Sequence, residues 1–533
     1  MGRSAVMKRK LVYGMNIALL SLVLFSGCGK NEVSQQEVLG KVQEIEDDAK
    51  DNAKDNAEGQ KDIENIDSIN RAKAPILSQT EWIDNRFADD GTLIVEGRFQ
   101  SIEVSGEGYE LVAEAIREWN KKEEESFAEN VDLNESYALD EVGNNPNFYG
   151  YSSTVEISPV RADASIISLK GFYYDYSGGV HGNYSSIGTT FDVKNGQQLS
   201  FWDLTEDKDA FSQYTLDAAL QQVTENYADG LFEGYQEIIK EIWETEPNWY
   251  LDAAGLTIVF SPYEIGPYAM GEAYVRLNYH ELGTLLKEEY QMGPQAGVAV
   301  LPLGEEAEIS LNHVSGDKEI VKLDWKENGE DYIGFNQYML SVGEQTILAA
   351  EIDRLDSIYL IQKENGRTFL LFEGDMASDD YVTYLYELTD GQIQKTYESD
   401  SCAFICEGTV TTEGMKLGIR VDALGTYMAY GYYEITEEGS LESISEWYDI
   451  ESSYQGLTNI KDLPVVIEGE QTVLPAGSQI RITGTNRSGI LKYQKIDSIE
   501  EGEIHYTVGE DNWPVYIDGI NENEYFEMLP YAG

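Results

Sequence analysis

The alternation of apolar and polar residues between about 90 and 292 predicts a mixture of strands and helices. Ile102 and Val104 alternate with polar residues, as in a half-buried strand, whereas the apolar residues from Leu111 to Trp119 recur at helical spacing. The same reasoning predicts strands over 166–176 and 187–193, helices over 207–227 and 235–243, and a hairpin that ends at Phe260. Residues 81–292 are therefore expected to form one α+β domain with an antiparallel sheet.

Beyond residue 300 the helical periodicity disappears and short strands end at turn signals. Examples are 357–362 before Asn365-Gly366, 381–388 before Asp390-Gly391, and 427–435 before Glu438-Gly439. Residues 300–460 are therefore expected to form a β-meander, a sandwich or a partial propeller, although the spacing is too irregular for a true repeat. Further short strands predict a small SH3-like barrel over 461–533.

The first 28 residues carry the pattern of a bacterial lipoprotein signal. Lys8-Arg9-Lys10 precedes an apolar run from Leu11 to Phe25, and Ser26-Gly27-Cys28 follows it. Phe25 stands where such motifs usually carry Leu, and an uncleaved membrane helix is the alternative, but the run is shorter than the ~20 residues that a span prefers. We expect residues 1–27 to be removed and Cys28 to carry the lipid, which anchors the protein outside the cell membrane.

The tether and the overall charge extend this picture. Residues 28–80 are acidic and poor in large apolar residues, as expected of a flexible tether. The whole chain has 97 acidic and 37 basic residues, and its formal net charge is −60. Such a surface repels nucleic acid and attracts cations or basic proteins, although solubility alone could also explain it.

Two glycine- and aromatic-rich segments stand at strand ends. They are Gly171-Phe-Tyr-Tyr-Asp-Tyr-Ser-Gly-Gly-Val-His-Gly182 and Phe260-Ser-Pro-Tyr-Glu-Ile-Gly-Pro-Tyr-Ala-Met-Gly271. With the intervening segments that begin at Phe191 and Phe201, they resemble the extracytoplasmic domain shared by RsiV-type anti-sigma factors and PdaC-type peptidoglycan deacetylases. The likeness covers roughly residues 90–292.

This resemblance implies a non-catalytic binding module, because the RsiV-type domain grips lysozyme. The acidity of the chain would suit such a basic partner. However, a lipoprotein signal replaces the cytoplasmic segment and membrane helix of the anti-sigma factors, which disfavours direct control of a sigma factor. The metal motif of the deacetylases, paired Asp with His-x-x-x-His, is also missing after the domain.

The candidate binding residues come from these two segments. In the first, Gly178, Gly179 and Gly182 permit a tight reversal with His181 at its tip; in the second, prolines stiffen an aromatic loop of the kind that anchors partners. The full set is Tyr176, Gly178, Gly179, His181, Gly182, Pro262, Tyr263, Pro267 and Tyr268. The alternatives are a structural turn for His181, bonded to backbone, and rings that merely cover the domain's own sheet.

Three functions remain open at this level. The first is non-enzymatic binding of a cationic wall-active protein such as lysozyme, and the second is binding of peptidoglycan or another glycan by aromatic faces. The third is a hydrolase centred on His181, with Asp175 or Asp192 as its carboxylate. No recognised nucleophile, nucleotide-binding or metal motif accompanies it, since His280-Glu281 lacks the second histidine of a zinc site. No cofactor and no metal are expected.

Overall fold

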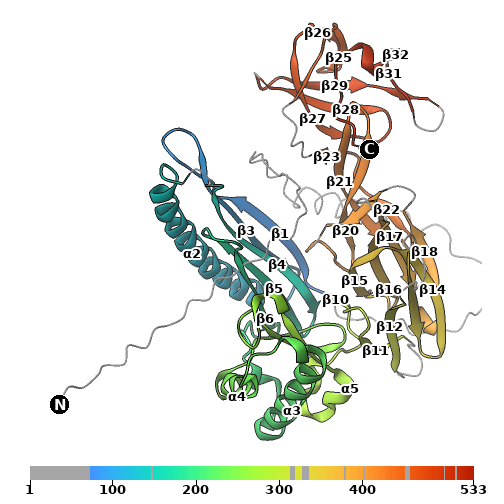
Figure 1. Ribbon diagram of the computed structural model, residues 1–533. Coiled ribbons are helices and arrows are strands. Elements are labelled where there is room, and N and C mark those ends of the chain that lie inside the picture. The colour runs from blue at the N-terminus through green and yellow to red at the C-terminus, as the bar shows by residue number, and fades with distance from the viewer. Residues whose placement is uncertain are drawn as a thin grey trace, which may run out of the picture.

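The computed structural model describes residues 73–532 apart from the short internal segments 146–147, 312–317, 327–334, 377–379, 400–401, 407, 451–455, 497 and 510–512. The predicted signal, Cys28 and nearly all of the predicted tether lie outside the described residues. What is described is mainly β-structure with few helices (Figure 1). Among the described helices, none is long and apolar enough to cross a bilayer.

The N-terminal part of the structure is a twisted sheet. Its strands are β1 (Ile76–Ile83), β2 (Arg86–Phe87), β3 (Leu93–Ser105), β4 (Tyr151–Asp163), β5 (Ile166–Tyr176) and β6 (Asn183–Asp192). β5 has the bounds predicted from the sequence. Neighbouring strands are antiparallel except β3 and β4, which are parallel. The prediction of an antiparallel sheet missed this pair because the long connection between the two strands is a helical crossover.

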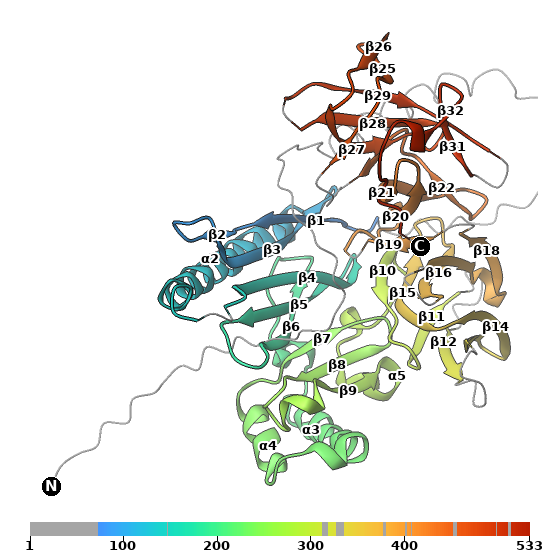
Figure 2. The ribbon, with the colours of Figure 1, turned by 45° about the horizontal axis from the view of Figure 1, so that its top comes forward.

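The crossover is the helix α2 (Glu110–Glu141), which covers one face of this sheet (Figures 1 and 2). Its buried stripe includes Val112, Ile116 and Trp119, and these side chains pack on residues of β3 to β6. The helix predicted near 111–119 is therefore confirmed and is longer than expected. Leu111 was expected on the apolar stripe, but it is 62% exposed because it stands one position off the buried repeat.

A smaller layered unit follows β6 and holds the second predicted segment. Its elements are η2 (Phe201–Leu204), α3 (Lys208–Tyr227), α4 (Tyr235–Thr245), β7 (Trp249–Leu251), β8 (Gly255–Phe260), β9 (Ala273–Asn278) and α5 (Tyr279–Leu282). Both predicted helices are confirmed, and Asp207 caps the first by accepting a hydrogen bond from Ala210 N–H. α3 and α4 pack on the three-stranded sheet β7–β8–β9 around Phe211, Ile239 and Trp243.

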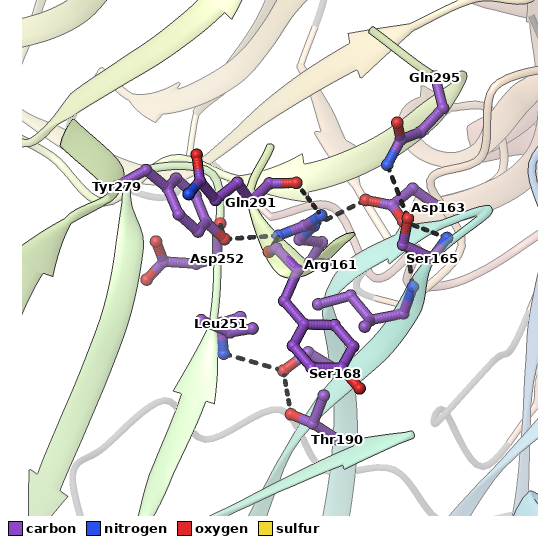
Figure 3. A network of polar contacts seen from close by, with 12 residues as sticks. Arg161, Asp163, Ser165, Ser168, Thr190, Leu251, Asp252, Tyr279, Gln291 and Gln295 are labelled. Carbon is purple, nitrogen blue, oxygen red and sulfur yellow. Dashed lines mark hydrogen bonds and ion pairs between the residues drawn. The ribbon is translucent and has the colours of Figure 1, made fainter. Parts of the chain in front are cut away.

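A buried arginine joins the smaller unit to the main sheet (Figure 3). Arg161 of β4 is fully buried, and its Nε lies 2.7 Å from Oδ2 of Asp163. Its other nitrogens donate to the Tyr279 hydroxyl at 2.6 Å and to the backbone oxygens of Tyr290 and Gln291. The network therefore fixes the end of the smaller unit, beyond β9, against the middle of the sheet.

The main sheet continues across the boundary predicted near residue 300. β10 (Gly297–Val300) lies between β4 and β15, so strands from both sides of that boundary share one sheet. The remaining strands of this half are β11 (Glu306–Ser310), β12 (Lys318–Lys326), β13 (Asn336–Val342), β14 (Gln345–Ile352), β15 (Arg354–Gln362), β16 (Thr368–Asp375), β17 (Tyr381–Glu387) and β18 (Gln394–Glu398). β11 to β14 form a separate four-stranded meander.

The C-terminal strands build a second large sheet, drawn in orange to red in Figure 1. They are β19 (Ala403–Ile405), β20 (Gly414–Asp422), β21 (Thr426–Ile435), β22 (Leu441–Ser443), β23 (Tyr448–Ile450), β24 (Leu457–Thr458), β25 (Leu463–Ile467), β26 (Glu470–Leu474), β27 (Gln479–Thr485), β28 (Ile490–Lys495) and β29 (Glu501–His505). The short strands β30 (Thr507–Val508), β31 (Val515–Ile517) and β32 (Ile520–Asn521) form a three-stranded sheet.

The predicted SH3-like barrel over 461–533 is wrong for the residues that the structure describes. No closed barrel forms there. β27 pairs with β23, a strand from the other side of the predicted boundary, and the two regions share one hydrophobic core. The sequence pattern located the strands, but pairing between segments that are distant in sequence decided the sheet.

Candidate functional site

The first candidate segment forms the turn between β5 and β6. Gly178 and Gly179 have φ angles of 93° and 99°, in the region that favours glycine, and they reverse the chain as expected. The Tyr176 hydroxyl closes the turn by donating to the Gly179 backbone oxygen at 3.2 Å. Val180, at the tip, is 99% exposed.

The second candidate segment follows β8 and returns the chain to β9. Pro262 is buried and Pro267 is exposed. Tyr263 has a φ angle of 67°, which an L-residue with a bulky side chain rarely adopts. Its side chain is nevertheless 45% exposed.

The fold brings rings from both segments together. His181 stacks on Tyr268 with ring centroids 3.9 Å apart and planes 17° apart. Tyr263 lies 5.8 Å from Tyr268, and Tyr184 meets it edge-on at 5.9 Å. We call His181, Tyr184, Tyr263 and Tyr268 the aromatic cluster. Three of its members were predicted; Tyr184 was missed, and its place two residues after Gly182, on a strand, was the only signal for it.

Burial shifts the pKa values of two tyrosines of the cluster. Burial raises the pKa of Tyr184 to about 12, and the nearby Glu272 carboxylate adds to this shift. Burial also raises the pKa of Tyr268. Glu272 itself accepts hydrogen bonds from Ser186 N–H, at 2.7 Å, and from the Tyr274 hydroxyl. Tyr263, which is 45% exposed, and the half-buried Tyr268 can present ring faces to a partner, whereas Tyr184 is buried beneath them.

Asp175 and Asp192, the carboxylates predicted to assist His181 in a hydrolytic site, form hydrogen bonds with other residues instead. Asp175 accepts hydrogen bonds from Asn134 at 2.6 Å and from Ser153 at 2.9 Å. Asp192 accepts from the backbone of its own turn and from the Tyr290 hydroxyl. Nδ1 of His181 contacts the Gly182 backbone oxygen. Among the described residues, no group of three or more His, Cys, Asp or Glu side chains could hold a metal ion.

A cavity of about 620 Å³ lies beside the aromatic cluster, and we call it the edge cavity. It follows the outer edge of β6 toward the start of β7. Its lining includes Tyr184, Ser185, Glu246, Asn248, Trp249, Pro262 and Glu264. Tyr184 and Pro262 also belong to the aromatic cluster or its loop, so the two features are continuous. Sequence reasoning missed the cavity because nothing in the Glu246-Pro247-Asn248 stretch indicates which strand it will face.

Comparison with known proteins identifies one part of this region. Residues 203–280 match a domain family described as protein of unknown function DUF3298. The chain contains a DUF3298 domain. This domain supplies Tyr263 and Tyr268 of the aromatic cluster and the Glu246, Asn248 and Glu264 walls of the edge cavity, whereas His181 and Tyr184 precede it. The finer resemblance to RsiV-type and PdaC-type proteins stays a prediction.

Solved structures of DUF3298 proteins are also similar to part of the chain. A family member from Bacteroides fragilis has 17% sequence identity and a TM-score of 0.33, over 41% of this chain and 96% of its own. A DUF3298 protein from Pseudomonas aeruginosa has 13% identity and a TM-score of 0.28, over 42% of this chain and 97% of its own. No curated protein matches the chain.

Proposed function

We propose that this protein is a lipid-anchored bacterial surface protein that binds a cationic wall-active protein, such as lysozyme, through the aromatic cluster. The observation that carries the proposal is the stacking of His181 on Tyr268, which joins two segments almost ninety positions apart into one half-exposed surface. Rigid tyrosines bury much area at a small cost in side-chain entropy, which is why they are frequent anchors of protein interfaces.

The charge of the chain supports a basic partner. A formal net charge of −60 steers a cationic protein toward this surface and accelerates encounter at low salt. Binding should therefore weaken as salt screens the charges, while the aromatic contacts persist. The Ser26-Gly27-Cys28 pattern supports a lipid anchor, which would place the cluster where wall-active proteins act.

The test is calorimetric titration of the full chain with lysozyme at low and at high salt. We expect binding that weakens at high salt and that the double variant Tyr263→Ala/Tyr268→Ala weakens about thirtyfold, the effect of losing an aromatic anchor worth ~2 kcal/mol. The matched control is Trp325→Ala/Tyr432→Ala, two exposed aromatic residues on β12 and β21. Absence of heat at both salt concentrations, or equal losses in both variants, would contradict the proposal.

Peptidoglycan binding is the second candidate, because the exposed face of Tyr263 could also stack on a sugar ring. It predicts sedimentation with isolated peptidoglycan that depends little on salt and is lost in Tyr263→Ala. Lysozyme titration without heat, together with salt-insensitive sedimentation, would favour this candidate over the first.

A further inference from the structure

The edge cavity has acidic walls and no basic ones. Glu246 follows α4, Glu264 lies in the loop after β8, and none of the residues that line the cavity is Lys, Arg or His. Trp249, Tyr184 and Pro262 line the same cavity and supply apolar surface. Such a lining disfavours an anionic ligand and suits a cation with an apolar stem.

In both Glu246 and Glu264, one carboxylate oxygen accepts hydrogen bonds from the protein and the other does not. Glu246 Oε1 accepts from Phe201 N–H and lies 3.4 Å from Trp249 Nε1, and Glu264 Oε2 accepts from Ser261 N–H at 2.9 Å. Oε2 of Glu246 and Oε1 of Glu264 have no protein partner among the described residues. Both side chains are thus oriented by the fold, with an acceptor left for a ligand.

Glu264 has no positively charged neighbour among the described residues of the cavity wall. Burial raises the pKa of Glu264, and only the Ser261 N–H opposes the shift, with no basic group contributing. Carboxylates that are largely removed from water are normally paired, so an unpaired one in a cavity wall points to a cationic ligand.

We propose that the edge cavity receives a lysine or arginine side chain of the basic partner, with its charged head between Glu246 and Glu264 and its stem against Trp249. This inference rests on the proposed function and deepens it, since Tyr184 and Pro262 connect the cavity to the aromatic cluster. A guanidinium fits best, because its five N–H donors match several acceptors in fixed directions, and charge-assisted hydrogen bonds are the strong ones.

The first experiment repeats the lysozyme titration with the full-length variant Glu246→Gln/Glu264→Gln. Glutamine keeps an oxygen acceptor for Phe201 and Ser261, so the local structure should persist, and circular dichroism checks this. We expect binding to weaken at least about tenfold. The control Glu241→Gln/Glu244→Gln removes two exposed charges from α4 and should change affinity little. If the double variant does not fold, Glu264→Gln alone replaces it.

The second experiment separates this inference from the proposed function. The full chain is titrated with Nα-acetylarginine methylamide and with its neutral citrulline analogue. We expect only the arginine compound to bind and Glu246→Gln/Glu264→Gln to abolish binding, even if lysozyme itself is not a partner. If Glu246→Gln/Glu264→Gln binds lysozyme as tightly as the wild-type protein does, the inference is overturned but the proposed function stands. Equal binding of the two compounds, or binding of chitobiose instead, would overturn it in favour of a neutral ligand.

Discussion

Replacement of Arg161 by methionine should strongly destabilise the region around the DUF3298 domain. The side chain of Arg161 is fully buried and that of its partner Asp163 is 4% exposed. Methionine would leave the Asp163 carboxylate buried beside an apolar side chain. It would also remove the donors for the Tyr290 and Gln291 backbone oxygens and for the Tyr279 hydroxyl.

The expected loss of unfolding free energy comes from the unpaired Asp163 carboxylate that remains buried, rather than from the lost attraction of the ion pair. Breaking a buried pair by removing one partner costs about 3–5 kcal/mol, because the remaining charge is uncompensated. Asp163 keeps the N–H donors of Ser165 and Ile166, so the lower half of that range is the better expectation. By contrast, Arg117→Met breaks an exposed pair on α2: the side chain of Arg117 is 67% exposed and that of its partner Glu114 is 62% exposed, so the loss should be at most about 1 kcal/mol.

Urea unfolding followed by tryptophan fluorescence measures both losses, since Trp243 and Trp249 are buried in the smaller unit. Adding Asp163→Asn to Arg161→Met should recover part of the stability, because it removes the stranded charge while an oxygen remains for Ser165 and Ile166. Equal midpoints for Arg161→Met and Arg117→Met would refute the reasoning. A double variant less stable than Arg161→Met would show that the charge is not the cause.

Three further predictions follow from single residues. Burial raises the pKa of Asp252 to about 6, so the folded state binds the Asp252 proton more tightly than the unfolded state does. The free energy of unfolding should therefore fall by about 2–3 kcal/mol as the pH rises from about 4 to 6. Denaturation measured at several pH values should show that Asp252→Asn removes this dependence. Tyr263→Gly should relieve the positive φ and leave the melting temperature unchanged or higher while it weakens partner binding; a clear drop in melting temperature would contradict this. Gly188→Ala would place a Cβ 1.8 Å from the Trp249 backbone oxygen, so a loss of at least about 1–3 kcal/mol is expected in denaturant unfolding, and wild-type stability would show that β6 and β7 are not so close.

The local elements of the fold could be predicted because short-range chemistry decides them. β5 has the predicted bounds, and α3 begins directly after its capping residue Asp207. Pairing was harder, because it depends on contacts between distant segments. β10 carries only four residues, yet it joins β4 to β15 and makes one sheet of two predicted domains. Nothing in its own sequence indicates those partners.

The candidate site also contains residues that local sequence signals predict and contacts that they do not. His181 and Tyr268 could be proposed from turn glycines and prolines, because each lies in a segment with its own local signal. Their stacking could not, since it requires the β5–β6 turn and the loop after β8 to meet. Glu264 and Asn248 were overlooked for a related reason: isolated polar residues beside a strand are common, and only the cavity shows which of them share a wall.

The aromatic cluster and the edge cavity have a common structural origin in the outer edge of β6. Among the described strands, β6 pairs only with β5. Where another strand would be expected, the Asn248 amide accepts from Gly188 N–H at 2.9 Å and donates to the Ser186 oxygen at 2.6 Å, while Glu272 accepts from Ser186 N–H. Side chains thus protect an edge that could otherwise recruit another chain. Because they fill less space than a strand would, they leave the cavity open beside the tyrosines, and one missing strand accounts for both halves of the candidate site.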